Sequence, residues 1–237
     1  MSAIVSVRGA ARDYQQGELT VRALRGVDLD ISEGEFTVLM GPSGSGKTTL
    51  LNLIGGLDEP SGGSIVVDGS DLAQMTSSQR SKLRLRRLGF VFQSYNLIPV
   101  LSAYENVEFV LLMAGMEAAE RDRRVLQTLK DVGLEGMESR RPNQLSGGQQ
   151  QRVAVARAIA SRPALVLADE PTANLDSKTG HALIELMRRL NDEQGVTFVF
   201  ATHDPKVMES ARRIVTLEDG QIVSDVQQDG EPPTEQV

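Results

Sequence analysis

Short apolar runs alternate with amphipathic segments over much of this chain. Runs of four or five mostly apolar residues have the length and composition of buried strands, and they occupy residues 36–40, 165–168, 197–201 and 214–217. Apolar residues spaced three and four positions apart predict helices over residues 47–54, 178–191 and 205–211. Because strands that alternate with helices usually form a parallel sheet covered by those helices, the pattern predicts an α/β fold.

Two parts of the chain show a different pattern. Residues 21–31 and 64–67 alternate apolar and polar side chains, as half-exposed strands do. In contrast, the middle of the chain predicts three helices, over residues 105–115, 118–132 and 149–160.

These patterns predict one domain over residues 1–226. Residues 1–93 and 162–226 are expected to form the α/β core with an additional β part, and residues 94–161 a helical subdomain. The polar residues 227–237 are expected to form a disordered tail.

Composition narrows the class of protein. The 237 residues are 40% hydrophobic, which is enough for a proper core. A net charge of −7, 4% aromatic residues and no tryptophan argue against nucleic-acid binding by charge or by base stacking. The chain has no cysteine, which excludes disulfides and thiolate metal sites. No segment has a signal-peptide core or approaches the ~20 apolar residues of a membrane span, so we expect a cytoplasmic chain.

A glycine-rich loop supplies the first candidate chemistry. Residues 41–48 read Gly-Pro-Ser-Gly-Ser-Gly-Lys-Thr and fit the phosphate-binding pattern G-x-x-x-x-G-K-[ST], between a predicted strand and a predicted helix. Glycines let backbone N–H groups converge on phosphate oxygens, and the helix N-terminus adds donors and a favourable dipole. We therefore expect a nucleoside triphosphate, with Lys47 at its terminal phosphates and the Thr48 hydroxyl as a Mg²⁺ ligand.

Further candidate groups follow two other predicted strands. Asp169 and Glu170 stand directly after residues 165–168, and His203 follows residues 197–201. A carboxylate at a strand's end can hold Mg²⁺, and a second one can orient or deprotonate a water molecule. A solvated pair of loop carboxylates is the alternative for Asp169 and Glu170, and a structural histidine is the alternative for His203.

Together with Leu-Ser-Gly-Gly-Gln at residues 145–149, these motifs make the chain resemble the nucleotide-binding subunit of an ATP-binding cassette (ABC) transporter. The resemblance covers residues 4–223. It implies the P-loop NTPase fold of an ABC cassette, with a mostly parallel sheet core, an antiparallel β part and a helical subdomain that carries the signature at residues 145–149. It also implies ATP and Mg²⁺ as cofactors.

Several positions match the family's nucleotide contacts. Tyr14 matches the aromatic residue that stacks on adenine, and Asp176 matches the aspartate of the D-loop. The signature contributes Ser146, Gly147, Gly148 and Gln149. The phosphate loop contributes Gly41, Pro42, Ser43, Gly44, Ser45, Gly46, Lys47, Thr48 and Thr49.

The positions that serve hydrolysis in the family are also present. Asp169 matches the Walker B aspartate, which would hold Mg²⁺ with Thr48 and Gln93. Glu170 matches the catalytic glutamate, and His203 matches the switch histidine. Gln93 and Lys47 match groups that respond to the terminal phosphate. Since no catalytic position departs from the pattern, the resemblance implies an active ATPase.

The signature also bears on assembly. It precedes the helix predicted over residues 149–160, so it offers a second phosphate-binding helix start. In the family, that second site comes from a partner subunit, which implies a head-to-tail homodimer enclosing two ATP molecules. The resemblance further implies an integral membrane permease subunit as partner.

Two surface segments leave alternatives open. The basic residues 80–87 could face lipid headgroups or nucleic acid, or could form a solvated helix face. Residues 94–101 carry several apolar and aromatic side chains that would be exposed if the segment is a loop. In the family this neighbourhood receives a coupling helix of the membrane subunit, and packing under the helical subdomain is the alternative.

Five segments bring the chain close to the macrolide-export and lipoprotein-release group, with the cell-division ATPase similar: residues 21–27, 52–58, 89–93, 149–153 and 167–172. The resemblance implies an ATPase at the cytoplasmic face of the inner membrane that powers export, lipoprotein release or mechanical transmission across the envelope. A regulator that gates cell-wall hydrolases without cargo, and a soluble ABC ATPase, are the alternatives. A nucleotide kinase would share the phosphate loop but would not need the signature.

Overall fold

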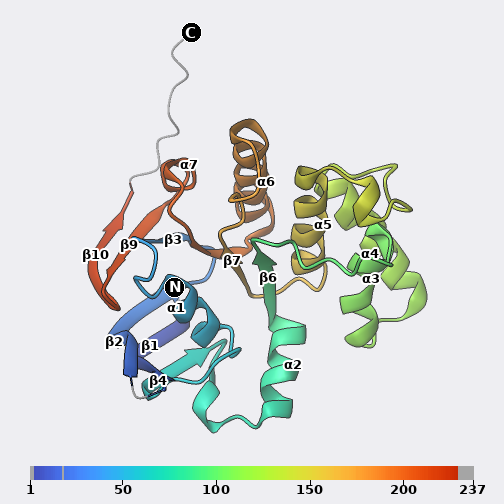
Figure 1. Ribbon diagram of the computed structural model, residues 1–237. Helices are drawn as coiled ribbons and strands as arrows, with labels where there is room; N and C mark the ends of the chain where they lie inside the picture. Colours follow the sequence, from blue (N-terminus) through green and yellow to red (C-terminus); the bar gives the residue numbers. More distant parts are fainter. Residues whose placement is uncertain (1–2, 18, 229–237) are drawn as a thin grey trace.

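The computed structural model describes residues 3–17 and 19–228, which form two sheets flanked by helices (Figure 1). The larger sheet has the strand order β10-β9-β3-β8-β7-β6. Its strands are β3 (Phe36–Met40), β6 (Leu88–Phe92), β7 (Leu165–Asp169), β8 (Thr197–Ala201), β9 (Arg213–Glu218) and β10 (Gln221–Gln227). All neighbours pair in parallel except β9 and β10, which are antiparallel.

The smaller sheet is antiparallel and has the order β2-β1-β4-β5. It consists of β1 (Ala3–Gln16), β2 (Leu19–Ser32), β4 (Gly62–Val67) and β5 (Ser70–Asp71). The expectation of a mostly parallel core with an antiparallel β part is therefore confirmed. The β1 strand and the short β5 strand had no separate prediction.

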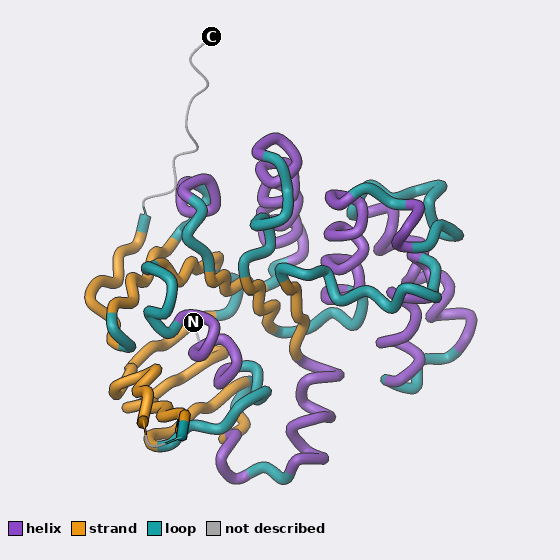
Figure 2. Tube along the Cα trace, in the orientation of Figure 1, coloured by secondary structure: helices purple, strands orange, loops and turns teal. Residues whose placement is uncertain are grey.

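Seven α-helices lie in the described part of the chain. They are α1 (Lys47–Ile54), α2 (Ser77–Arg87), α3 (Ala103–Met113), α4 (Ala118–Asp131), α5 (Gly147–Ile159), α6 (Ser177–Gln194) and α7 (Pro205–Glu209). Helices α3, α4 and α5 gather at one side of the sheets, as Figure 2 shows. None of the helices in the described ranges is long and apolar enough to cross a membrane.

The larger sheet is buried on both faces at β3, β6, β7 and β8, because these strands alternate side chains between two apolar clusters. Leu39, Leu167 and Val199 face α1 and the antiparallel sheet. On the other face, residues such as Phe36, Val166 and Phe198 join a cluster that includes residues of α3, α4, α5 and α6. Burial on both sides explains why these strands read as continuous apolar runs rather than as alternating patterns.

Helix starts differ by a few residues from the sequence prediction because capping side chains set them. Helix α3 begins at Ala103, two residues earlier than expected, since Ser102 and Glu105 form a capping box. Helix α5 begins at Gly147 rather than at residue 149, since Ser146 caps it in the same way.

The basic run at residues 80–87 lies on α2, and three of its arginines, Arg80, Arg84 and Arg87, contact their own chain. Arg84 donates to Gly56 O at 2.7 Å, and Arg80 pairs with Glu59. This favours the solvated helix face over a lipid or nucleic-acid surface.

The expected tail needs one correction. Gln227 is the last residue of β10, because the pairing of β10 with β9 extends to it. Gln228 is also described, and its N–H donates to Arg212 O at 2.7 Å. Residues 229–237 of the expected tail lie outside the described residues.

Helix α5 contacts both the sheet and the neighbouring helices. It packs on β6, α3, α4 and α6. The division into a core (residues 1–93 and 162–226) and a helical subdomain (94–161) therefore stays a proposal, with α5 as the element shared by both parts.

Helix α5 approaches the sheet closely at Gly89 of β6. A Cβ atom there would lie 2.4 Å from Ala158 O, which is backbone and cannot rotate away. We expect Gly89→Ala to cost about 2 kcal/mol of folding free energy, or about 4–8 °C in Tm for a chain of this size.

Gly62→Ala is the matched control. The added Cβ would be in ordinary contact, 3.9 Å from the Cβ of Ala11. Thermal unfolding of both variants checks the prediction, and equal Tm values for the two would contradict it.

Candidate functional site

The glycine-rich loop folds tightly between β3 and α1. Gly41 and Gly46 have φ angles of 149° and 104°, which favour glycine. A Cβ at Gly41 would lie 2.1 Å from Leu217 O, and one at Gly46 would lie 2.6 Å from Ala23 O. The loop thus needs these glycines for their backbone angles and for the close approach of neighbouring strands.

Lys47 is held inside this loop. Its Nζ donates to Gly41 O at 2.7 Å and to Pro42 O at 3.0 Å, and the residue is buried. An ammonium group whose partners are neutral carbonyls remains available to an anion entering the loop, because a charged acceptor forms a stronger bond.

Thr48 joins the loop to β7. Its hydroxyl donates to Asp169 Oδ1 at 3.0 Å. Burial raises the pKa of Asp169, and the charge of Glu170 raises it further, while the Thr48 hydrogen bond and Lys47 oppose the shift. The nearby positive charge therefore does not fully offset the burial of this carboxylate. A hydroxyl beside a carboxylate is a set of oxygen ligands that suits Mg²⁺.

Glu170 is held by the loop that follows β8. Thr202 donates to Glu170 Oε2 at 3.1 Å, and His203 Nδ1 lies 2.7 Å from Oε1. Because a carboxylate only accepts, this contact places a proton on Nδ1. Glu170 itself has a φ of 46°, a left-handed conformation that is costly for a non-glycine residue and is common at functional sites.

A cavity of about 730 Å³ opens in front of these groups. Among the predicted site residues, its lining includes Pro42, Ser43, Gly44, Gly46, Lys47, Thr48, Thr49, Gln93, Glu170 and His203. Asp169 lies behind Thr48, to which it is hydrogen-bonded. The structure therefore brings the ends of β3, β6, β7 and β8 to one cavity.

The cavity also includes residues that sequence reasoning missed. Val21, Arg22 and Ala23 of β2 line it, as does Ala173. Residues 21–23 were predicted as strand and carried part of the subfamily resemblance, but they were not expected at the site, because nothing local in the sequence shows that β2 passes over the phosphate loop. Thr202 was also missed, although its place directly before His203 could have suggested it.

Tyr14 is not among the residues that line the cavity, but it pairs with Val21 across β1 and β2. Its hydroxyl donates to Asp58 at 2.7 Å, and the Arg12 guanidinium lies 4.6 Å from the ring centroid. Arg12 is also paired with Asp58 at 2.7 Å. The ring is therefore held beside the cavity by one carboxylate and one cation.

The signature lies away from this cavity, against the start of α6. Ser146 accepts from Gln149 N at 3.3 Å, and a Cβ on Gly148 would lie 2.3 Å from a Thr179 methyl carbon. Asp176 caps α6 by accepting from Thr179 N and Oγ1, and these hydrogen bonds lower its pKa. Neither Ser146–Gln149 nor Asp176 lines the cavity of the phosphate loop.

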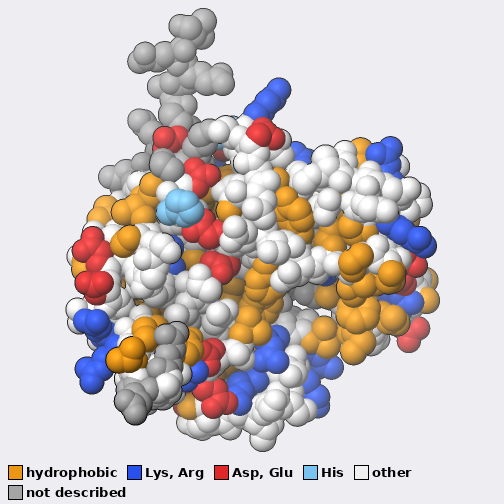
Figure 3. Space-filling view, in the orientation of Figure 1, with side chains coloured by type: hydrophobic (Ala, Val, Ile, Leu, Met, Phe, Trp, Pro, Cys, Tyr) orange, Lys and Arg blue, Asp and Glu red, His pale blue; other side chains and the backbone are white. Residues whose placement is uncertain are grey.

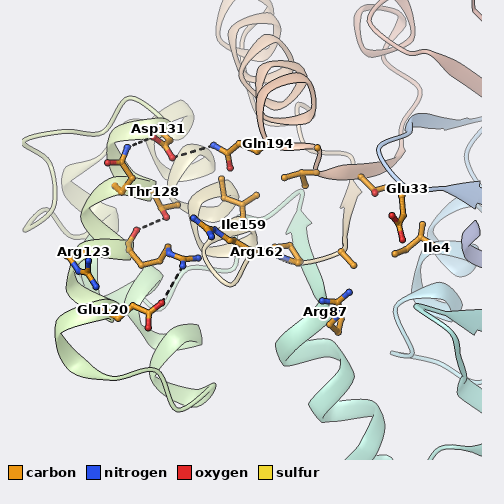
Figure 4. A pocket seen from close by; sticks show the side chains of 17 residues that line it. Ile4, Glu33, Arg87, Glu120, Arg123, Thr128, Asp131, Ile159, Arg162 and Gln194 are labelled. Carbon is orange, nitrogen blue, oxygen red and sulfur yellow. Dashed lines mark hydrogen bonds and ion pairs between the residues drawn. The ribbon is translucent and has the colours of Figure 1, made fainter. Parts of the chain in front are cut away.

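A second cavity, of about 890 Å³, lies at the opposite edge of the sheet (Figure 4). It lies where β7 and β8 begin, and none of the predicted site residues lines it. Its lining includes Arg123, Arg124 and Arg162 as well as Glu120 and Asp131, so its charges are mixed. Burial, and next the charge of Arg162, lower the pKa of Arg124.

The chain is similar in sequence to a known protein family and to individual proteins of that family. The family described as "ABC transporter" matches residues 24–173. An uncharacterized ABC transporter ATP-binding protein of Thermotoga maritima is 50% identical over 209 residues, covering 88% of this chain and 89% of that protein. The lipoprotein-releasing system ATP-binding protein LolD of Anaeromyxobacter dehalogenans is 48% identical, with 93% of both chains covered.

Two further matches concern a longer protein and a solved structure. The macrolide export ATP-binding/permease protein MacB of Syntrophobacter fumaroxidans is 47% identical over 92% of this chain, which spans 31% of that protein's length. A dimeric post-hydrolysis structure of the ATP-binding cassette MJ0796 bound to ADP and Pi superposes with a TM-score of 0.88 at 45% identity. The superposition covers 96% of this chain and 100% of the MJ0796 chain. The relative MJ0796 is from Methanocaldococcus jannaschii.

The raised pKa of Asp169 has a consequence for stability. The pKa of Asp169 in the folded protein lies above its ordinary value of 3.8. At a pH below 3.8 the carboxyl group is protonated and its burial does not lower the free energy of unfolding. At a pH above the raised pKa the group is charged and its burial lowers the free energy of unfolding by the full amount. We expect Asp169→Asn to raise the Tm of the nucleotide-free protein at pH 7, with a smaller gain as the pH falls through the raised pKa.

Thermal unfolding at pH 7 and at acid pH measures this difference. Asp225→Asn is the control, because it removes the negative charge that pairs with Arg213 at 2.7 Å and should lower the Tm. A fall in Tm for Asp169→Asn at pH 7 would contradict the burial argument.

Proposed function

This chain belongs to the ABC transporter family of ATP-binding domains, and on that premise we propose that it is the ATP-hydrolysing subunit that powers a separate membrane protein. Membership of the family implies ATP hydrolysis. One observation carries the proposal for this chain: Lys47, the pair Thr48–Asp169 and the pair Glu170–His203 meet around a single cavity.

The chemistry proposed for these residues follows from their contacts. Lys47 would exchange the carbonyl oxygens of Gly41 and Pro42 for phosphate oxygens. Thr48 and Asp169, with Gln93 at the cavity wall, would hold Mg²⁺, which supplies neutralisation of phosphate charge when bound.

Glu170 would orient the attacking water and accept its proton. Thr202 and His203 fix both of its oxygens, so the carboxylate is oriented before the substrate enters. His203 is 74% exposed in the single chain, so it is open to a terminal phosphate from the cavity side.

We further propose a head-to-tail homodimer. The signature Ser146–Gln149 and Asp176 do not line the cavity of their own chain, so a signature that contacts nucleotide would have to come from a second copy. The solved relative at TM-score 0.88 is described as dimeric, which supports this arrangement. Tyr14 would then stack on adenine at the outer side of each site.

The membrane subunit is proposed to dock on the side formed by α3 and the loop before it. Val100 is 71% exposed, and Phe109, Leu112 and Met113 of α3 are also exposed large apolar residues. Figure 3 shows apolar side chains gathered over this side of the molecule. Leu97, in contrast, packs against the core, so simple packing accounts for that residue but not for Val100.

The similarity to LolD and MacB supports work at the cytoplasmic face of the inner membrane: export, lipoprotein release or mechanical transmission. A regulator that gates cell-wall hydrolases, and a soluble ABC ATPase, are the alternatives. Purifying the ATP-trapped Glu170→Gln variant from gently solubilised membranes separates them. Recovery of a membrane protein with few spans and a large extracytoplasmic domain supports either the transport role or the regulator. Recovery with ribosomes and no membrane protein supports the soluble ABC ATPase.

Glu170→Gln tests the chemistry directly. The amide keeps the shape of the side chain but cannot accept a proton, so we expect ATP turnover to fall by at least about 100-fold while ATP binding persists. With ATP and Mg²⁺, sedimentation should show a dimer. A monomer at saturating ATP would refute the proposed ATP-driven dimerisation of the isolated subunit.

Val100→Glu tests the docking surface. A charge at this exposed position should weaken binding of the membrane partner at least about tenfold, because it would have to be desolvated in an apolar interface. Basal ATPase should stay near the wild-type rate. Val223→Glu on β10, an equally apolar exposed site elsewhere, is the control. Unchanged partner binding by Val100→Glu would exclude this surface.

A further inference from the structure

A buried glutamine on α5 contacts the main chain beside two proposed catalytic groups. Gln151 is 0% exposed. Its Nε2 donates to Pro171 O at 2.8 Å and to Phe92 O at 3.3 Å. Pro171 directly follows Glu170, and Phe92 directly precedes Gln93. One side-chain amide therefore joins the segments that carry both groups.

The contacts fix the orientation of this amide. Carbonyl oxygens only accept, so the NH₂ group must face Pro171 and Phe92, and Oε1 must point away from them. Within residues 3–17 and 19–228, no protein group donates to the buried Oε1. Gln151 is therefore held only through the two carbonyls.

Asn191 on α6 makes a useful comparison. It is also buried, and its Nδ2 donates to Gly34 O at 2.8 Å and to Val196 O at 2.7 Å. Its Oδ1 in addition accepts from Arg212 at 3.2 Å. The carbonyls of Gly34 and Val196 lie just before β3 and β8, at the edge of the sheet opposite the phosphate loop. Asn191 is thus a structural amide of the same kind without a link to the site.

Other hydrogen bonds connect the loop at residues 93–96 to α5 and to the segment before α6. Arg157 of α5 donates to Tyr95 O at 3.0 Å and to Asn96 O at 2.6 Å. Asn174 donates to Gln93 O at 2.9 Å. Since α5 begins at the signature and helices move as rigid units, a shift of the signature would reach the Gln93 segment through Arg157 and Gln151, and the Glu170 segment through Gln151.

We propose that Gln151 is a positioning residue for hydrolysis, which aligns Glu170 and Gln93 with the signature helix. The inference rests on the proposed ATPase function. Gln151 acts through the main chain at Pro171 and Phe92 and is too far inside the protein to touch the nucleotide. Its contribution is geometric, because a misplacement of about 1 Å at a reacting group can cost about 100-fold in rate.

Gln151→Met tests the proposal, since it keeps the length of the side chain and removes both donated hydrogen bonds. We expect kcat for ATP to fall at least about tenfold and KM to stay within about twofold, because Lys47 and the phosphate loop are untouched. Gln151→Asn, whose amide is one methylene shorter and so withdraws from both carbonyls, should also lower kcat. It also provides a second variant if the methionine variant fails to fold.

Asn191→Leu is the matched control, since it also removes a buried amide that binds two carbonyls. It should lower the Tm by a similar amount and leave kcat within about twofold of wild type. In the Glu170→Gln background, Gln151→Met should still form the ATP-dependent dimer, because Ser146 and Gln149 cap α5 independently of Gln151.

Three results would overturn the inference: kcat of Gln151→Met within about twofold of wild type, an equal loss of kcat in Asn191→Leu, or loss of the ATP-dependent dimer with Gln151→Met. An equal loss of kcat in Asn191→Leu would mean that Gln151 has only a structural role. Loss of the dimer would mean that Gln151 acts by stabilising the signature. Wild-type protein without ATPase activity is a separate outcome, because it would refute the proposed function on which the inference rests.

Discussion

Parallel pairing of β6, β7, β8 and β3 is the constraint on which the site depends. Parallel strands end at a common edge, and their register here aligns Phe92 with Asp169 and Asp169 with Ala201. Gln93 and Glu170 directly follow β6 and β7, and His203 follows β8 after one residue, so the pairing brings together segments that are more than 100 residues apart in the sequence. The pairing persists because both faces of the sheet are covered by apolar clusters.

The edge that this pairing creates is costly to the folded chain. Asp169 is a carboxylate with a raised pKa, Glu170 has a left-handed backbone, and Lys47 is buried against neutral carbonyls. In the proposed function, the charges of Asp169 and Lys47 would gain partners when phosphates and a divalent cation enter. The site is therefore arranged for the bound state, and stability given up in the empty protein is the cost of that arrangement.

Helix α5 connects this edge to the rest of the molecule. Its start is the signature, capped by Ser146 and pressed against Thr179 through Gly148. Its middle touches the loops of Glu170 and Gln93 through Gln151, and Ala158 near its end contacts β6 at Gly89. A second copy of the chain that contacts the signature would thus act on an element already joined to the hydrolytic groups.

The sequence by itself determined the fold class, the family and the local structure of the phosphate loop. The glycines of the loop, its flanking strand and helix, and the buried strands carry strong local signals, because each depends on backbone angles or apolar runs within a few residues. The signature motif also carried the family resemblance, although its neighbours in space could not be read from it.

The tertiary structure alone decided which distant residues meet. That β2 lines the cavity with Arg22, that Thr202 binds Glu170, and that Gln151 joins Phe92 to Pro171 all depend on contacts between elements far apart in the chain. Glutamine, threonine and arginine are common residues whose roles depend on what lies opposite them. Their partners are set by strand order and helix packing, which no short stretch of sequence encodes.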